Sequence, residues 1–295
     1  MAPRFWMQGK ARERGRIEPS DEQTATRMPT KSASLREVYG VMLRNSLIRE
    51  MSFKLNFLLW MLVEVLWFLG QIVFIEVVFS YVGAIGGWSK WEVVLLIGTH
   101  QLIGQLFQAF FYMNLANLPE LVRTGRMDFM LLLPIDTQFV VSLKQFGMDN
   151  VVNAFVGAGF VLFSLWKLAI VPTAAQLLLY AVAVCCGILI HYGIMLTFAA
   201  SSFWMVRSQG LIYGYYSLFN IGRYPDTIYR GAFKLVFSWM IPVIIVANIP
   251  ARLLIHAAEN PWPIMLQLVA ATLFIIGTTR LMWNSALRHY SSASS

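Results

Sequence analysis

Residues 174–202 read AAQLLLYAVAVCCGILIHYGIMLTFAASS, and this stretch decides the fold class of the chain. It contains no Asp, Glu, Lys or Arg, and as a helix it is long enough to cross the ~30 Å hydrocarbon layer of a bilayer. The whole chain shares this character, because 58% of its 295 residues are hydrophobic and only 13% are charged. Soluble domains are usually about 25% charged. We therefore expect an all-α integral membrane protein rather than a cytosolic enzyme, a disordered regulator or a disulfide-stapled secreted module.

Further apolar segments on both sides predict a protein with six transmembrane helices. The predicted spans are about 55–79, 93–116, 146–166, 174–202, 208–224 and 264–283. The fifth span is open, because 232–250 is also apolar enough to cross. If 208–224 crosses, then 226–262 is a short re-entrant segment at the outer face. If 232–250 crosses instead, then 208–230 stays on the cytosolic side.

The distribution of Lys and Arg predicts the orientation. With 232–250 as the fifth span, 20 of these residues lie on the side of the termini and 3 on the other side. With 208–224 as the fifth span, the counts are 17 and 6. Basic residues accumulate in the cytosolic loops of membrane proteins. Both readings therefore predict a multi-pass membrane protein with both termini in the cytosol.

The two ends of the chain differ from the predicted membrane domain at 52–290. Residues 1–33 are rich in charge and lack the apolar core of a signal peptide, so we expect a disordered cytosolic tail. In 34–51, apolar residues recur every three to four positions between arginines, which predicts an amphipathic helix in the membrane interface. Residues 291–295 form a second short tail. The basic N-terminus lacks interleaved aromatic residues, so we do not expect it to bind nucleic acid.

Polar and aromatic residues inside the predicted spans are candidates for a substrate pathway. Glu64 lies in the middle of the first span, Gln71 follows on nearly the same face, and Trp67 lies between them. A carboxylate among aromatic rings suits a cationic, apolar solute. Alternatively, Glu64 is protonated or pairs with another helix. The aromatic fifth segment adds Tyr213, Tyr216 and Phe219 as a possible substrate-facing wall.

Two histidines and two cysteines within the spans have simpler interpretations. His100 and His191 are more often interhelical hydrogen-bonding groups than members of a proton relay. Cys185 and Cys186 are neighbours on one helix, so they point in different directions and form neither a disulfide nor a metal site. We expect no metal and no catalytic residues in this chain. It also lacks the G-x-x-x-x-G-K-[ST] motif that cradles ATP phosphates.

The link between the second and third spans, 117–145, carries the most specific motif. Its first part reads NLPELVRTGRMDFMLLLPIDTQF, residues 117–139, in which charged residues precede an apolar run. Gly125 permits a turn with positive φ, and Pro134 stops any helix that leads into it. An exposed helix and turn of this kind is a docking surface, whereas the alternative is an amphipathic loop lying in the headgroups.

This loop resembles that of the permeases of type-two ATP-binding-cassette exporters. The shared pattern is formed by Leu121, Gly125, Met127, Asp128, Leu131, Leu132 and Pro134. The proline-punctuated stretches at 224–229, 240–242 and 248–251 resemble the re-entrant outer segment of that family, and the closing 283–294 resembles one bacterial branch. The resemblance covers about 35–294.

The resemblance implies an ATP-driven exporter in which this chain forms the pathway with a second permease, identical or related. It implies that a cytosolic ATPase dimer docks on the interfacial helix and on the loop at 117–134. The implied coupling residues are Glu120, Arg123, Gly125, Arg126, Asp128 and Pro134, and the implied outer gate is formed by Pro225, Pro242 and Pro250. ATP and Mg²⁺ would bind the partner ATPase rather than this chain. The solute is not identified. An ion-coupled carrier or channel without an ATPase, and a non-transporting membrane protein, remain alternatives.

Overall fold

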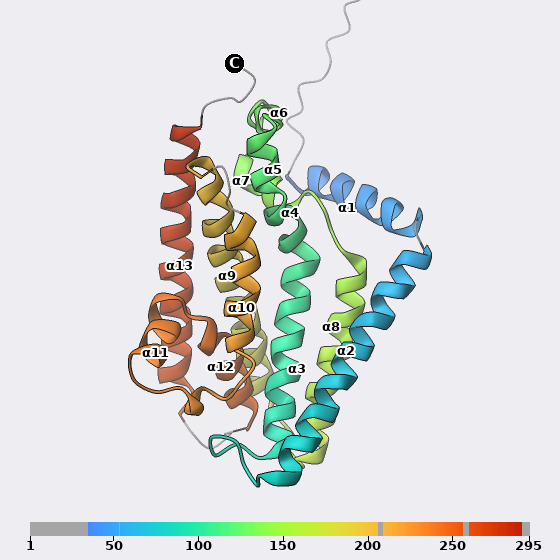
Figure 1. Ribbon diagram of the computed structural model, residues 1–295, viewed down its shortest axis with the longest axis vertical. Coiled ribbons are helices and arrows are strands. Elements are labelled where there is room, and N and C mark those ends of the chain that lie inside the picture. Colours follow the sequence, from blue (N-terminus) through green and yellow to red (C-terminus); the bar gives the residue numbers. More distant parts are fainter. Residues whose placement is uncertain (1–34, 53, 206–208, 256–259, 291–295) are drawn as a thin grey trace, which may run out of the picture. The chain divides into compact units, whose positions relative to one another are not determined.

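The described part of the chain is built from helices alone, apart from one isolated bridge between Ile85 and Trp88. The computed structural model describes residues 35–52, 54–205, 209–255 and 260–290 (Figure 1). The α-helices are α1 (Leu35–Ser52), α2 (Lys54–Tyr81), α3 (Lys90–Phe107), α4 (Met113–Ala116), α5 (Leu118–Arg123), α6 (Met127–Leu131), α7 (Thr137–Leu143), α8 (Met148–Lys167), α9 (Ala174–Ala200), α10 (Gln209–Ile221), α11 (Gly231–Leu235), α12 (Val243–Ile255) and α13 (Trp262–His289). The predicted all-α class is confirmed, and the predicted tails at 1–33 and 291–295 lie outside the described residues.

Five helices in the described residues are long and apolar enough to cross a membrane. They cover Leu58–Tyr81, Lys90–Arg123, Met148–Lys167, Ala174–Phe203 and Trp262–His289. A sixth candidate is the pair Gly231–Met240 and Val243–Ile255, which is bent by 83°. Helix α10 has 13 residues, fewer than a straight span needs. The count of six spans and the identity of the fifth therefore stay predictions.

Short polar motifs start two of the long helices. Ser89 precedes α3, and its backbone N–H donates to the side chain of Glu92 at 2.6 Å. Thr173 precedes α9 and forms the same reciprocal arrangement with Gln176. Such capping boxes satisfy backbone N–H groups that have no partner within the helix. They fix where each apolar run begins to be helical.

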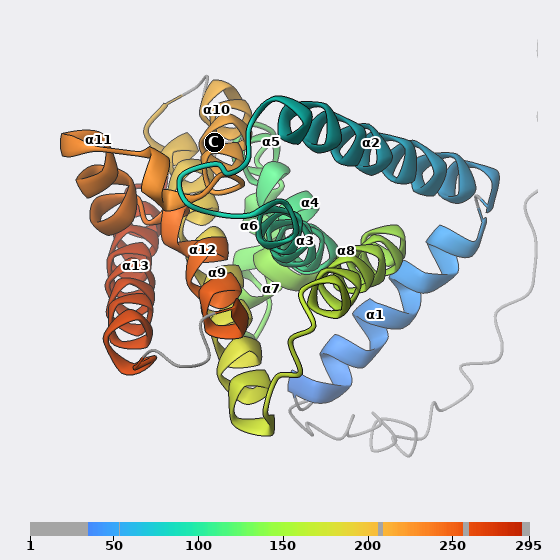
Figure 2. The ribbon, with the colours of Figure 1, turned by 90° about the horizontal axis from the view of Figure 1, so that it is seen from below.

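Helix α3 lies at the centre of the arrangement, between α2 and α8 on one flank and α9, α12 and α13 on the other (Figures 1 and 2). It packs closely on α8 because glycines meet at their contact. A Cβ added at Gly157 would lie 2.8 Å from the backbone nitrogen of Leu102, and one added at Gly98 would lie 3.1 Å from the carbonyl oxygen of Gly157. Small residues allow membrane helices to approach to this distance. The rim helix α2, in contrast, leaves most of its surface open.

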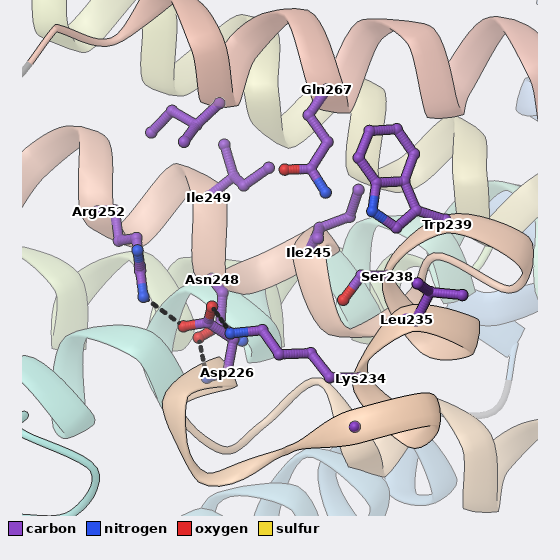
Figure 3. Close-up of a pocket in the computed structure, with 12 residues that line it drawn as sticks. Asp226, Lys234, Leu235, Ser238, Trp239, Ile245, Asn248, Ile249, Arg252 and Gln267 are labelled. Carbon is purple, nitrogen blue, oxygen red and sulfur yellow. Dashed lines mark hydrogen bonds and ion pairs between the residues drawn. The ribbon is translucent and has the colours of Figure 1, made fainter.

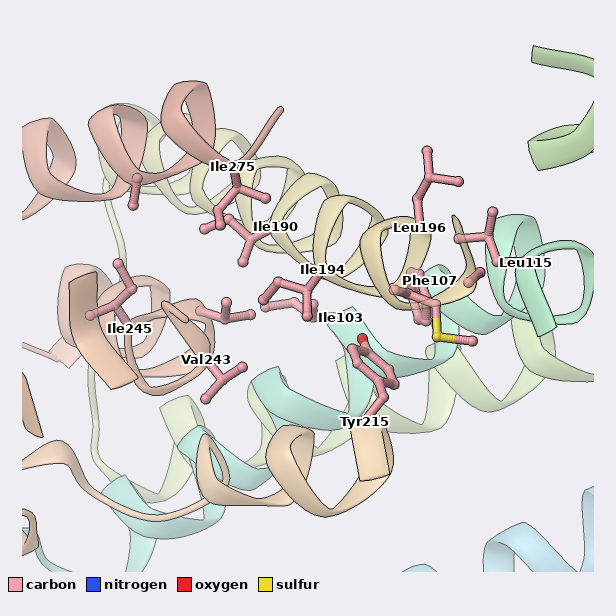
Figure 4. Close-up of a cluster of buried hydrophobic side chains, with 14 of the residues drawn as sticks. Ile103, Phe107, Leu115, Ile190, Ile194, Leu196, Tyr215, Val243, Ile245 and Ile275 are labelled. Carbon is pink, nitrogen blue, oxygen red and sulfur yellow. The ribbon is translucent and has the colours of Figure 1, made fainter. Parts of the chain in front are cut away.

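A cluster of fully buried apolar side chains joins α3, α9, α10, α12 and α13 (Figure 4). Ile103 and Phe107 of α3 pack near Ile190 and Ile194 of α9. Tyr215 of α10 belongs to the same cluster. These contacts hold the half of the molecule that lies away from α2. The substrate-pathway candidates must therefore be sought at the edges of this cluster.

A π-helical turn, η1 (Gln108–Tyr112), interrupts the continuation of α3 into α4. Just beyond it, Asn114 donates to the carbonyl oxygen of Gln145 at 2.7 Å and accepts from the backbone N–H of Gln145 at the same distance. This pair of hydrogen bonds holds the segment before α8 against the end of α4. The π turn and Asn114 together set which face of α4 meets its neighbours.

Helix α1 occupies the segment that was predicted to lie in the membrane interface. Figures 1 and 2 show it lying across the end of α2 rather than in line with it. Its apolar and polar residues do not separate into two strong faces. The helix itself is found, and its place in the interface stays a prediction.

Candidate functional site

The predicted coupling loop forms the short helices α5 and α6 at one end of the molecule. Gly125 separates them with a φ of 70°, so the expected positive-φ turn is present. Glu120 accepts hydrogen bonds from Arg123 at 2.8 and 3.0 Å, and Arg126 lies 4.0 Å from the same carboxylate. Beneath them Met127 is fully buried. The loop is therefore a folded unit with a charged surface.

The tip of this loop presents apolar side chains to the outside. Phe129 is 69% exposed and Leu132 is 80% exposed, and Figure 1 shows α6 projecting at the end of the helix bundle. Pro134 follows as the chain turns toward α7. Large apolar residues without a packing partner mark interaction surfaces. Sequence reasoning chose the charged residues and missed Phe129 as the most prominent group.

The coupling loop is tied to the C-terminal helix by polar contacts. Asp136 accepts from the backbone N–H of Phe139 at 3.0 Å and from Arg280 of α13 at 3.0 Å. Burial raises the pKa of this carboxyl, but these hydrogen bonds and the charge of Arg280 outweigh burial and bring the pKa below its ordinary value. Burial and the nearby Asp128 raise the pKa of Tyr290 to about 12. Asp136 and Arg280 therefore join the segment before α7 to α13.

Glu64 lines an open cavity of about 390 Å³ on the side of α2. One carboxylate oxygen of Glu64 accepts from Nε2 of Gln105 on α3 at 3.3 Å. A second carboxylate, Asp149 at the start of α8, lines the same cavity. The other lining residues are aromatic or amide residues, one methionine and one glycine: Trp60, Gln108, Tyr112, Met113, Gln145, Phe146, Gly147 and Asn150. The wall thus combines acidic groups with aromatic rings.

Trp67 and Gln71 line a second open cavity of about 390 Å³, further along α2. Arg223 and Tyr224, which follow α10, lie on the opposite wall. The two cavities share α2, and they occupy successive stretches of it. The three pathway candidates on α2 therefore lie along one stretch of this helix, with Glu64 in the first cavity and Trp67 and Gln71 in the second.

The three aromatic candidates on α10 do not form a common wall. Tyr213 is exposed. Tyr216 packs on Tyr112, with ring centres 5.0 Å apart, and its hydroxyl donates to Gln108 at 3.5 Å. Phe219 instead stacks on His100, with ring centres 4.0 Å apart. Only Tyr216 thus contacts the lining of the cavity that contains Glu64.

His100 and His191 lie in the protein interior and hold α10 in place. Nε2 of His100 donates to the carbonyl oxygen of Phe219 at 3.1 Å. A hydrogen bond of 2.6 Å joins Nδ1 of His191 to the hydroxyl of Tyr215. Both histidines bridge helices, as the simpler interpretation of the sequence proposes.

The three prolines of the predicted outer gate each mark a change of backbone direction or a break in hydrogen bonding. Pro225 precedes the short 3₁₀ turn η3 (Asp226–Ile228), and Pro242 lies at the bend between η4 (Val236–Met240) and α12. Pro250 lies inside α12 and is buried. Because proline has no backbone N–H to donate, α12 lacks one backbone hydrogen bond at Pro250, whereas Pro225 and Pro242 lie between helical elements.

A polar network that the sequence did not reveal holds this segment together (Figure 3). Asp226 pairs with Lys234 at 3.1 Å and with Arg252 at 2.5 Å. Asn248 accepts from the backbone N–H of Asp226 at 2.9 Å and donates to the carbonyl oxygen of Tyr224 at 3.1 Å. Thr227 donates to Gly86, in the loop before α3, at 2.6 Å. No motif could have signalled this network, since its members are separated by up to 141 positions.

Comparison with known proteins places the chain in a family. The sequence model of the ABC-2 family transporter proteins matches residues 65–294. No curated protein and no solved structure matches. The family match covers most of the chain, including the predicted coupling loop, but Trp60 and Glu64 of the first cavity lie before it. This chain therefore belongs to the ABC-2 family of transporter proteins, the membrane permeases that work with an ATP-binding-cassette ATPase.

Proposed function

We propose that this permease is an exporter subunit that forms its solute pathway together with a second permease, identical or related. In the proposed mechanism, separate ATPase subunits bind ATP and Mg²⁺ and drive the movement of the helices. Family membership supports this proposal over an ion-coupled carrier, because ABC-2 permeases have an ATPase partner.

The observation that carries the coupling proposal is the exposed tip formed by Phe129 and Leu132. A soluble partner that covered these two side chains would bury apolar surface, at about 25 cal/mol per Å². The flanking Glu120, Arg123 and Arg126 form a charged rim around this apolar centre. An apolar centre with a polar rim is the usual anatomy of a protein interface. Contacts from Asp136 to Arg280 connect the docking loop to α13.

The two cavities along α2 support a pathway on this flank. Glu64 and Gln71 are polar, yet they lie on a helix with a largely open surface. Polar groups that face lipid are costly, so a water-filled pathway or a second permease is the better environment for them. We place the interface between two permeases along α2 and the exposed side of α10, which includes Tyr213.

The contacts around α10 favour the reading in which 208–224 crosses the membrane. The short helix η2 (Ser201–Phe203) packs on α5, at the end of the bundle that carries the proposed coupling loop. Thr227, in contrast, donates a hydrogen bond to the carbonyl oxygen of Gly86, in the loop between α2 and α3. The chain therefore passes from one end of the bundle to the other between these points. In this proposal, 226–262 re-enters from the outer face, and both termini lie in the cytosol of a bacterium with this protein in its inner membrane. The proposed segment lacks a large outer domain, which favours a small or lipid-like solute.

The experiment that tests the assignment is a gentle purification of the tagged chain from its host, followed by identification of co-purifying proteins and an ATP-hydrolysis assay. We expect a stoichiometric ATPase with activity in the sample. A related second permease in the same sample would show a heterodimer. A clean chain with no ATPase and no hydrolysis would contradict the proposal.

A pair of variants then tests the docking surface. We expect Phe129→Asp combined with Leu132→Asp to remove the ATPase from the purified sample, because charge replaces the apolar centre of the interface. Val171→Asp is the control, since Val171 is an exposed apolar residue between α8 and α9, outside the loop. If the double variant retains the ATPase as well as the control does, the ATPase docks elsewhere.

A further inference from the structure

The re-entrant outer segment encloses a cavity of about 420 Å³ between α11, η4, α12 and α13. Its polar lining residues are Asp226, Lys234, Ser238, Asn248, Arg252 and Gln267. Its apolar lining residues are Leu235, Trp239, Ile245, Ile249 and Ile264. In Figure 3, Gln267 and Trp239 lie on one side of this space, and Asp226 and Lys234 lie on the other. The cavity is separate from the two cavities along α2.

Two buried groups in this cavity that can donate a hydrogen bond have no partner among the described residues. Ser238 is only 5% exposed, and its hydroxyl has no partner among the described residues. Nε of Arg252 is also buried and without a partner among the same residues. The carboxylate of Asp226, in contrast, already accepts from Lys234 and Arg252. Buried polar groups are nearly always hydrogen-bonded, so the unused donors indicate an occupant that supplies acceptors.

The net charge of the lining favours a negative occupant. Two cations, Lys234 and Arg252, share the single carboxylate of Asp226. Lys and Arg donate only, and charge-assisted bonds to an oxyanion are stronger than bonds between neutral groups. An oxyanion group with several oxygens, such as a phosphate, could accept from more than one of the donors Lys234, Arg252 and Ser238 that line this cavity.

The apolar part of the cavity and its rim favour an occupant with a hydrocarbon body. Ile245 and Ile249 form buried apolar wall, whereas Leu235 and Trp239 are exposed at the edge. Exposed Leu and Trp side chains on a membrane protein suit contact with lipid chains and the headgroup boundary. An oxyanion held by the donors would leave its tail along this edge.

We propose that this cavity binds an anionic amphiphile, with an oxyanion headgroup held by Lys234, Arg252 and Ser238 and a tail that lies against Leu235 and Trp239. The amphiphile would connect α11, η4 and α12 around the bend of 83°, because Lys234, Ser238 and Arg252 lie on these three elements. This proposal does not depend on the ATPase partner.

The test is native mass spectrometry of the delipidated full chain, titrated with phosphatidylglycerol, with phosphatidylcholine and with inorganic phosphate. We expect phosphatidylglycerol to bind about tenfold more tightly than phosphatidylcholine, because both lipids carry a phosphodiester oxyanion but the choline of phosphatidylcholine adds a positive charge beside Lys234 and Arg252. We expect inorganic phosphate to leave the phosphatidylglycerol complex intact. Equal binding of the two lipids would overturn the proposal, and displacement by phosphate would identify a free oxyanion as the ligand and overturn the amphiphile.

Variants locate the site. We expect Lys234→Gln to abolish most of the preference for phosphatidylglycerol, and Lys234→Arg to retain it. We expect Ser238→Ala to weaken the binding of phosphatidylglycerol several-fold, because it removes a donor to the phosphodiester. Lys90→Gln is the control, because Lys90 is a partly exposed lysine paired with Glu76 outside this cavity. Ser238→Ala removes one oxygen atom only, so it reports on binding even if Lys234→Gln fails to fold. Unchanged binding of phosphatidylglycerol in both Ser238→Ala and Lys234→Gln would exclude this cavity.

Discussion

Helix α2 and the helical stretch Lys90–Arg123, which begins with α3, are both apolar enough to cross a membrane, yet only 11% of the most apolar part of α2 is buried in the protein, against 72% of the corresponding part of that stretch. Helix α2 has the higher mean hydropathy of the two, and it is also the more exposed. Helix α3 carries His100, Thr99 and Gln105 in the interior, whereas α2 presents Leu, Val and Trp side chains outward. In a bilayer, lipid tails solvate apolar surface as well as protein does, so hydrogen-bonding residues and glycines mark the interior better than apolar ones. The comparison teaches that polarity locates the centre of this protein.

The largest effect should come from forcing a bulky residue into the contact between α3 and α8. We expect Gly98→Leu to destabilise the protein by about 3 kcal/mol or more, because a side chain there meets the backbone of α8 at 3.1 Å. Gly70→Leu on α2 is the matched control, since a Cβ at Gly70 meets nothing within 4 Å. Thermal unfolding in detergent measures both. Equal losses would remove the distinction between the two helices.

The next effect concerns the carboxylate by which α2 contacts α3. If Glu64 attracts a cationic solute, we expect Glu64→Gln to weaken stimulation of ATP hydrolysis by a lipophilic cation about tenfold, with no change for a neutral analogue. The assay uses the purified complex in liposomes. Gln71→Leu controls for polarity in the neighbouring cavity. A loss of the same size for both solutes would point to folding rather than recognition.

Substitutions at a buried and at an exposed position within one turn of α10 should also differ in the stability that they cost. We expect Tyr215→Phe to cost about 0.6–1.7 kcal/mol, because it removes the 2.6 Å hydrogen bond to His191 in the interior. Tyr213→Phe should have no measurable effect, since Tyr213 is exposed. Thermal unfolding distinguishes the two. A stable Tyr215→Phe variant would show that packing, rather than this hydrogen bond, holds α10.

The smallest effect should lie outside the membrane, between the coupling loop and α13. Asp136 and Arg280 are each about half exposed, so we expect Arg280→Gln to lose less than about 1 kcal/mol at neutral pH. Because the pKa of Asp136 is lower in the folded protein, its contribution is present above the ordinary value of 3.8 and is lost as pH falls through the folded value. The wild type and the variant should therefore converge in acid. Arg230→Gln serves as the surface control, and a difference that persisted in acid would assign the effect to something other than this carboxylate.

The helices could be predicted because long apolar runs without charge have no other stable structure in a bilayer. The turn at Gly125 followed from the conformational freedom of glycine. The partners could not be predicted, because contacts such as Asp226 with Arg252 and Glu64 with Gln105 depend on how helices distant in sequence come together. Residues 208–255 were ambiguous for a related reason. A short helix and a bent pair both read as one apolar span, and only contacts such as that of Thr227 with Gly86 indicate the path.

The π-helical turn Gln108–Tyr112 changes the direction in which the side chains of the following helical residues point. A π turn contains one residue more than an α turn, so the residues beyond it are rotated by roughly 100° from where a regular helix would put them. That rotation is what aims Asn114 at Gln145. Deleting one residue from this turn would restore an ideal helix and turn Asn114 away from its partner. A chain one residue shorter would then have a more regular helix and a misaligned coupling end.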